Sequence, residues 1–309
     1  MAALRPVWEE LAAQQESTIF QSFDWNLLAA RMFAEREVPH VVFVRTSNGM
    51  AIVPAVRRLA DRTIRFLGEE LFDYRCPLFA GDPEVLTQAL TFLAASGDPL
   101  EVTAVPGSMR KLFPPDLAFE PFCNAPCVRR EHVSAEQFAL NHTRLVRNLR
   151  RLDRLGVELK SYTGNDWCVL RSVYQRKAAQ DPDSLFHDPL RAEFIVNAAA
   201  LNPDSIEVFT LESATNLGAA LVTLREPHVR RFYTCWFDPA IAKHSPALSL
   251  IHEVTRQSLE QGLDCDYMTG EQPYKLRLAT GSVPLFRARA SSEELELLAA
   301  SRTAGLKVA

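Results

Sequence analysis

Hydrophobic and polar residues follow two different periods along the first hundred residues of the chain. Apolar side chains spaced three and four apart predict helices over 24–35, beginning at Asp24, and over 83–95. Between them, 40–68 reads as three short strands, the first two joined at Asn48-Gly49, a dipeptide typical of tight hairpins. A further short strand is expected over 100–105. This part of the chain should therefore form an antiparallel meander with helices beside it.

The second part of the chain carries longer apolar stripes and longer β-branched runs. Helices are predicted over 143–155, 166–179, 189–201 and 246–261, with short helical pieces after Ser134 and from Gln272. Strands are predicted over 157–161, 205–211, 218–225, 229–236, 264–268 and 283–288. Antiparallel strands separated from the next strand by one long helix indicate a mixed sheet covered by helices.

The length of the chain, 309 residues, fits two domains of ordinary size. The character of the sequence changes at the polar stretch Val128–Val133, so we place the boundary there, with an N-terminal lobe over 1–132 and a C-terminal lobe over 133–309. The expected fold class is α/β of the α+β kind, in which each lobe is a mixed, mostly antiparallel sheet flanked by helices.

Composition narrows the class of protein further. Hydrophobic residues make up 47% and charged residues 23%, which is ordinary for a packed globular chain. The net charge of −4 argues against nucleic acid as a partner, because phosphate-binding proteins usually carry a basic excess. Neither an export signal nor an apolar run long enough for a membrane span is found, so a cytoplasmic location is expected. Six cysteines without a second pair at zinc spacing predict reduced thiols and no metal site.

A strand, a short loop and a helix start meet between Trp236 and Leu250. Ser245 is placed as the N-cap of the helix and Pro246 as its first residue. The first backbone N–H groups of a helix lack partners within it and carry partial positive charge, which suits a pyrophosphate. Lys243 and His244 precede the helix and could add charge. An ordinary capped helix explains the same residues.

A second group of candidate residues follows the strand 264–268. The chain turns at Gly270 and enters a short helix that carries Tyr274 and Lys275. Glu271 could act as a base, Tyr274 as an acid and Lys275 as a contact for phosphate or carboxylate. A capped turn with surface charges is the structural alternative.

Arginines form a stripe on the predicted helix 143–155. Arg147, Arg150, Arg151 and Arg154 share one face, with Arg144 before them, and three leucines form the opposite face. Such a stripe can bind an anion or can be a solvated surface.

Taken together, these stretches resemble the CelD-like acetyltransferases, a branch of the GNAT superfamily related to the FemAB-type transferases. The resemblance extends over nearly the whole chain and is strongest over 140–280. It rests on Phe20-Gln21-Ser22 with Trp25, Phe66-Leu67-Gly68 with Asp73-Tyr74, the arginine helix ending at Gly156, Tyr233 with Asp238 and Ser245-Pro246, and Asp266 with Gly270, Glu271, Tyr274 and Lys275. One departure is Ala247, where the family usually has glycine.

The resemblance implies two tandem GNAT-like lobes and transfer of an acyl group from acetyl-CoA or another acyl-CoA to a small amine or hydroxyl acceptor. The cofactor would lie at Lys243, His244, Ser245, Ala247, Leu248 and Lys275. Glu271 or Asp266 would take the acceptor proton, and Tyr274 would protonate the departing thiolate. The acceptor would contact Arg147, Arg151, Tyr233 and Asp238.

Three other functions remain open at this point. A FemAB-like transferase would use charged tRNA, although the net charge speaks against it. A binding or scaffold protein would keep the fold without turnover, and Ala247 supports that possibility. A hydrolase is disfavoured because the chain has no Gly-x-Ser-x-Gly elbow. The sequence indicates neither the acceptor nor the oligomeric state.

Overall fold

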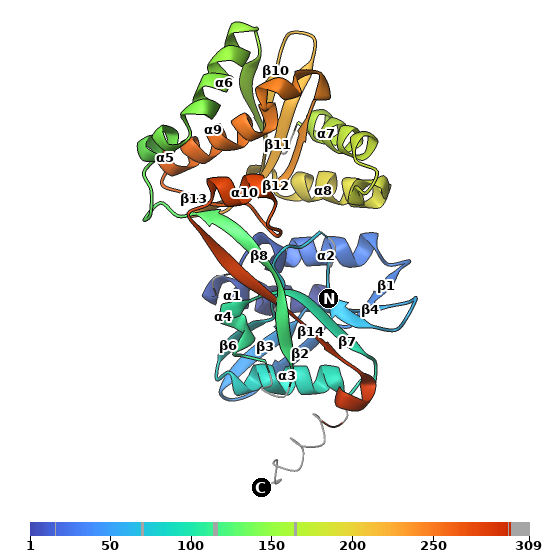
Figure 1. Ribbon diagram of the computed structural model, residues 1–309. Coiled ribbons are helices and arrows are strands. Elements are labelled where there is room, and N and C mark those ends of the chain that lie inside the picture. Colours follow the sequence, from blue (N-terminus) through green and yellow to red (C-terminus); the bar gives the residue numbers. More distant parts are fainter. Residues whose placement is uncertain (16, 69–70, 114–116, 164–165, 296, 298–309) are drawn as a thin grey trace. The chain divides into compact units, whose positions relative to one another are not determined.

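A computed structural model describes residues 1–15, 17–68, 71–113, 117–163, 166–295 and 297 (Figure 1). The chain forms two compact units. Unit 1 contains 1–123 and the described residues from Pro284 onward, and unit 2 contains 124–283. The polar stretch Val128–Val133 predicts a single boundary at 132/133, with the C-terminus in the second lobe. The structure differs because the last strand pairs within unit 1.

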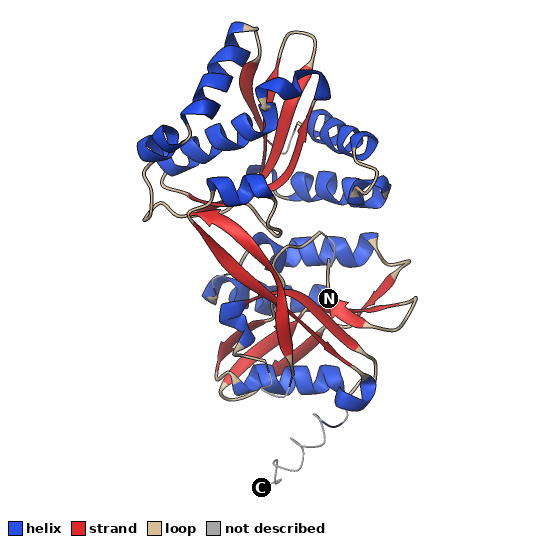
Figure 2. Ribbon diagram, in the orientation of Figure 1, coloured by secondary structure: helices blue, strands red, loops and turns tan. Residues whose placement is uncertain are grey.

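Unit 1 contains two sheets (Figure 2). The larger has the order β1-β4-β5-β7-β14, and all neighbours are antiparallel except β5 and β7. The smaller has the order β2-β3-β6 and is antiparallel. The strands are β1 (Glu37–Pro39), β2 (Val42–Arg45), β3 (Gly49–Val53), β4 (Ala55–Arg58), β5 (Ile64–Phe66), β6 (Leu78–Gly81), β7 (Leu100–Pro106) and β14 (Gly281–Ala290). The helices are η1 (Ala2–Leu4), α1 (Arg5–Gln14), η2 (Ile19–Gln21), α2 (Phe23–Met32), α3 (Glu84–Ala94) and α4 (Gly107–Arg110).

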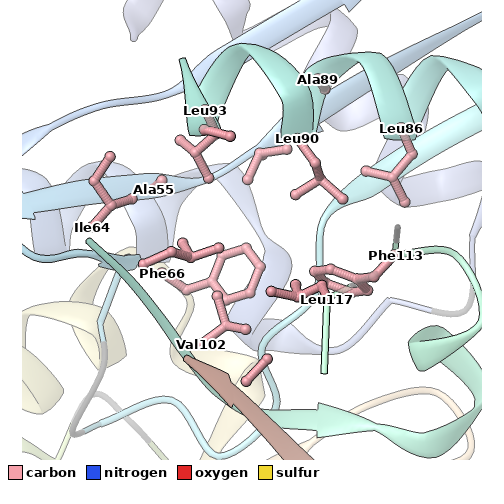
Figure 3. Packing of buried hydrophobic residues seen from close by; sticks show 14 of the residues in the cluster. Ala55, Ile64, Phe66, Leu86, Ala89, Leu90, Leu93, Val102, Phe113 and Leu117 are labelled. Carbon is pink, nitrogen blue, oxygen red and sulfur yellow. The ribbon is translucent and has the colours of Figure 1, made fainter. Parts of the chain in front are cut away.

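A core of unit 1 lies beneath α3, which packs on β2 and β3 of the smaller sheet, and side chains of the larger sheet complete it. Figure 3 shows Leu90 and Leu93 of α3 on the side of Ile64 and Phe66 of β5, and Leu86 pointing toward Phe113 and Leu117. All these side chains are buried, and each buried side chain of this size contributes roughly 1.5–3 kcal/mol of transfer free energy. The apolar stripe predicted over 83–95 is therefore the inner face of α3.

The predicted meander over 40–68 is divided between the two sheets. The hairpin at Asn48-Gly49 is confirmed, with Val44 opposite Ala51. Pro54, which has no N–H to donate, then interrupts the ladder, and β4 pairs with β1 and β5 in the other sheet. The helix predicted from Asp24 begins at Phe23, because the hydroxyl of Ser22 caps it.

The sheet strands of unit 2 follow the order β8-β13-β12-β11-β10-β9, antiparallel except between β12 and β13, and the residues of β8 up to Cys123 belong to unit 1. The strands are β8 (Phe119–Val128), β9 (Glu158–Thr163), β10 (Ile206–Glu212), β11 (Leu217–Arg225), β12 (Val229–Phe237) and β13 (Asp264–Asp266). The helices are α5 (Ala135–Asn141), α6 (Thr143–Arg154), α7 (Trp167–Gln180), η3 (Leu185–His187), α8 (Pro189–Leu201), η4 (Pro203–Ser205), η5 (Pro239–His244), α9 (Pro246–Glu260) and α10 (Pro273–Leu278).

The helices of unit 2 cover both faces of this sheet (Figure 1). α5, α6 and α9 lie on one side, and α7 and α8 on the other. The four long helices and the strands 205–211, 218–225 and 229–236 are confirmed within one to three residues. The strand predicted over 264–268 ends at Asp266, because Met268 has a positive φ of 63°. The fold class, a mixed and mostly antiparallel sheet flanked by helices in each unit, is confirmed.

Candidate functional site

The parallel pair of strands in unit 2 opens at one end. β12 and β13 pair at Val229↔Asp264, Arg230↔Cys265 and Arg231↔Asp266. β13 ends there, whereas β12 continues to Phe237. The rest of β12 therefore runs on beyond the end of its parallel neighbour. An extended ligand can add to such a strand edge as a further strand would.

A β-bulge lies on β12 just beyond that point. The register with β11 shifts at Val222/Thr223, whose partners are Thr234 and Phe232, so that Tyr233 is the extra residue. The bulge reverses the alternation of side chains. Phe232, Cys235 and Phe237 belong to the apolar cluster under α9, whereas Thr234 approaches Tyr174 of α7.

The helix start predicted at Ser245 follows the open end of β12. Ser245 is the N-cap of α9, but its hydroxyl does not cap the helix, because the residue has a left-handed backbone with φ 49°. Its carbonyl accepts the first helical hydrogen bond, from the N–H of Ser249, at 2.9 Å. Within the described part of the chain, nothing accepts a hydrogen bond from the N–H groups of Ala247 and Leu248. These two donors and the helix dipole make this end a seat for an anion.

The residues before α9 form the last turn of η5. Lys243 and His244 stand there, and Lys243 is exposed. Asp238, predicted to contact the acceptor, caps η5 instead: its carboxylate accepts from the N–H of Ala240 at 2.9 Å. Gly218 lies beneath this turn, where a Cβ would be 2.8 Å from Ile241, so the glycine allows the close approach of η5 to β11.

Asp266, predicted as a possible base, is part of a buried ion pair. Its carboxylate binds the guanidinium of Arg231 and accepts from the N–H of Met268 at 2.8 Å. Arg231 also binds both carboxylate oxygens of Glu226, at 2.9 and 2.8 Å. Because Arg231 and Asp266 are the last partners of the β12–β13 ladder, this pair holds the strands together where they begin to separate.

Lys275, predicted as a phosphate contact, is buried and directed toward the backbone. Its ammonium donates to the carbonyls of Met268 and Thr269, at 3.3 and 2.6 Å. The turn over these residues has positive φ at Met268 and, at 98°, at Gly270. The ammonium stabilises this turn, because the carbonyls of Met268 and Thr269 lie beyond the end of β13.

Tyr274 lies in the first turn of α10, and Glu271 follows the turn that ends at Gly270. Tyr274 packs against the apolar cluster beneath α9, which includes Cys235 of β12. Burial, and to a smaller extent the nearby Cys235 thiol, raises the pKa of Tyr274, so its phenol stays protonated and can serve as a proton donor. Glu271 is exposed, and its carboxylate accepts from the side-chain amide of Asn124 at 3.0 Å.

The structure thus brings together only some of the predicted site residues. Tyr233 lies on β12, and Ser245, Ala247 and Leu248 lie at the start of α9. Tyr274 of α10 packs against the same apolar cluster as Leu248 and Cys235. Arg147 lies elsewhere: with Arg150 it lines a pocket of about 480 Å³ shared with Arg256 and Glu260 of α9. Arg256 is ten positions along the helix from Pro246, a rise of about 15 Å.

Sequence analysis missed the two arginines of β12. Arg230 is buried, binding both oxygens of Glu207, at 2.8 and 3.1 Å, and the hydroxyl of Ser258 at 2.7 Å. The available signal was the pair Arg230-Arg231 inside an otherwise apolar strand, because buried arginines need carboxylate partners.

None of the helices that the structure describes is long and apolar enough to cross a membrane. Over the same residues, histidine, cysteine, aspartate and glutamate side chains form no group of three or more that could hold a metal ion.

Residues 141–276, which lie within unit 2, match the family model described as an acetyltransferase (GNAT) domain. A search among curated proteins gives no significant match.

Solved structures share the fold over most of their length. A conserved protein of unknown function from Bacteroides thetaiotaomicron is 12% identical, with a TM-score of 0.64 over 94% of this chain and 98% of that one. The C-terminal domain of a putative lysylphosphatidylglycerol synthetase from Agrobacterium fabrum is 13% identical, with a TM-score of 0.63 over 97% and 96%. FemX is 8% identical, with a TM-score of 0.61 over 96% and 98%.

Proposed function

We propose that unit 2 is an acyl-CoA-dependent acyltransferase that moves an acetyl or longer acyl group to an amine or hydroxyl of a small acceptor. The observation that carries the proposal is the open end of β12, which leads through η5 to a helix start with two N–H donors. The match of residues 141–276 to the acetyltransferase domain and the CelD-like resemblance support it.

The residues of this end fit the chemistry of acyl-CoA. The N–H groups of Ala247 and Leu248 would bind the pyrophosphate, and Lys243 and His244 would add charge beside it. The edge of β12 near Tyr233 would hold the pantetheine arm by backbone hydrogen bonds. Ala247, in place of the usual glycine, leaves both N–H groups available, because its methyl group is small and its backbone is helical.

The transfer itself requires two protons to move. The acceptor nitrogen or oxygen attacks the thioester carbonyl, the carbon–sulfur bond breaks, and the sulfur leaves as a thiolate that takes a proton from Tyr274. The acceptor loses its own proton to a base, directly or through water. Glu271 is the better candidate than Asp266, because it is exposed, whereas Asp266 is buried and held by Arg231. Most of the rate would come from positioning.

Cofactor binding is tested first, by thermal shift with CoA, acetyl-CoA and longer acyl-CoAs. A ligand at about 100 times its Kd should stabilise the fold by about 2.7 kcal/mol. Ala247→Asp should abolish the shift without loss of stability, because a carboxylate repels phosphate yet favours a helix start. Ala135→Asp, at the start of α5, is the matched control and should keep the shift. If no acyl-CoA raises the melting temperature, the proposal fails.

Tyr274→Phe tests the proton donor. Loss of a general acid should lower turnover by about 10²- to 10⁴-fold and leave the thermal shift with acetyl-CoA unchanged. Unchanged turnover would remove Tyr274 from the mechanism.

An aminoacyl-tRNA-dependent reaction, as the FemAB-type resemblance and the fold shared with FemX suggest, is the competing function. Transfer from charged tRNA, with no response to any acyl-CoA, would establish it instead.

A further inference from the structure

The arginines of α6 differ from most other arginines of unit 2 in making no ion pair. Among the described residues, none forms an ion pair or side-chain hydrogen bond with Arg144, Arg147, Arg150, Arg151 or Arg154. By contrast, ion pairs are made by Arg129, Arg171, Arg191, Arg225, Arg230, Arg231 and Arg256. Five arginines without an ion pair among the described residues are therefore concentrated on one helix of a chain whose net charge is −4.

The five arginines repel one another along α6. Arg147 stands four positions before Arg151, and Arg150 four positions before Arg154, a spacing at which like charges destabilise a helix. All five side chains are exposed, whereas Leu145 and Leu152 are buried against the α9 cluster. The helix cannot rotate to separate these charges, because its apolar face is fixed. From Arg144 to Arg154 the stripe extends about 15 Å.

Exposed leucines stand at both ends of the stripe. Leu140, at the end of α5, is 60% exposed and lines the pocket of about 480 Å³ beside Arg147 and Arg150. Leu155, just after α6, is 62% exposed. Figure 1 shows α5 and α6 following one another along the outer side of α9. We call the five arginines, Leu140 and Leu155 the α6 surface.

We propose that the α6 surface docks this protein on an anionic membrane surface. The guanidinium groups would bind lipid phosphates, and the two leucines would enter the boundary between headgroups and acyl chains. The charge favours phosphate in general, and the leucines favour a lipid source. A single-stranded nucleic acid would instead be expected to stack on exposed aromatic side chains. Phe138, the aromatic residue of α5, is buried.

The pocket at Arg147 and Arg150 is distinct from the proposed cofactor seat, although α6 also packs against η5, which precedes the seat. The pocket includes Arg256 and Glu260, near the C-terminal end of α9, whereas the seat is at the start of that helix. Membrane docking therefore does not depend on acyl transfer, and each proposal can fail without the other.

The test is co-sedimentation of the full chain with vesicles of phosphatidylcholine containing phosphatidylglycerol, and with pure phosphatidylcholine. We expect binding to the anionic vesicles alone, weakened by salt. The triple variant Arg147→Gln/Arg150→Gln/Arg151→Gln should bind about 100-fold more weakly, since each basic residue near the surface contributes roughly fivefold. Leu140→Gln/Leu155→Gln should bind more weakly than the parent while keeping its salt dependence.

A matched control removes three positive charges elsewhere. Arg31, Arg45 and Lys111 are exposed and have no ion pair among the described residues. Arg31→Gln/Arg45→Gln/Lys111→Gln should bind like the parent, and circular dichroism should show that both triple variants are folded. Absence of binding to anionic vesicles, equal loss in the control, or tighter binding to a tRNA or duplex than to vesicles would each overturn the proposal.

Discussion

Among the described residues, each unit contains one parallel pair of strands. The two pairs differ in the elements around them and in where their strands end. In unit 1, β5 pairs with β7 at Ile64↔Leu100, and β14 covers the other side of β7. The chain between β5 and β7 also supplies β6 to a second sheet. In unit 2, η5 and α9 alone connect β12 to β13, and β13 ends early. A parallel pair can thus complete a core or open into a site, depending on where one strand stops.

The side chains at these two pairs differ as well. Ile64 and Leu100 of unit 1 belong to the apolar cluster beneath α3 (Figure 3). The corresponding end of the ladder in unit 2 is a buried ion pair, Arg231 with Asp266. Charged residues thus fix the point at which β12 and β13 separate, where an apolar contact would have left the strand ends less strictly defined.

The largest expected effect in this comparison is from Arg231→Ala. Removing the guanidinium takes away the positive charge that pairs with the carboxylates of Asp266 and Glu226. This loss should lower the free energy of unfolding by about 3–5 kcal/mol. Urea denaturation measures this. Arg171→Ala, which breaks an exposed pair with Glu193, is the control and should cost less than about 1 kcal/mol. Equal costs would show that the ion pair does not hold the strands.

A smaller change in the free energy of unfolding is expected at acid pH, where His252 of α9 becomes protonated on unfolding. Burial lowers the pKa of His252 to about 4, with the nearby His142 acting in the same direction. Its unfolded value is near 6.5. Between these two pKa values the imidazole is protonated in the unfolded state but neutral in the folded state. The free energy of unfolding therefore falls as the pH decreases from 6.5 toward 4, by up to about 3 kcal/mol.

His252→Phe should flatten this part of the stability profile, measured by urea denaturation between pH 7 and pH 4.5. The exposed His228→Gln variant should keep the parent slope. If the slope is the same in all three proteins, acid sensitivity in this range comes from groups other than His252.

The smallest expected effect concerns the helix start itself. Ser245→Gly should raise the melting temperature slightly, with a gain of up to about 1 kcal/mol, because glycine adopts φ 49° without strain. Ser134→Gly should instead cost a few tenths of a kcal/mol, because Ser134 caps α5 through its hydroxyl, at 3.2 Å from the N–H of Gln137. Loss of stability in both variants would contradict the strain assigned to Ser245.

Much of the fold followed from the sequence. The period of apolar residues predicted α3, α6 and α9, and Asn48-Gly49 predicted the hairpin of β2 and β3. These features depend on residues a few positions apart, which the sequence shows directly. The strand predicted over 283–288 was found, but its partner was not, because β7 is more than 170 positions earlier in the chain.

The site was predicted less completely. The helix start after Ser245 and the position of Tyr274 could be read from local order. The engagement of Asp266 by Arg231, and of Lys275 by the carbonyls of Met268 and Thr269, could not. A carboxylate or ammonium has the same sequence signature whether it is available to a ligand or held by a buried partner.

The sequence by itself determined the four long helices of unit 2, helix α3, the strands β10, β11 and β12, the hairpin turn and the helix start at Pro246, because these arise from backbone sterics and short-range periodicity. The tertiary structure alone decided that β14 belongs to unit 1, that β13 stops beside Arg231, and that, among the described residues, the arginines of α6 make no ion pair while those of β12 do. Those outcomes depend on which distant side chains meet, and long-range pairing is set by the packing of the whole unit.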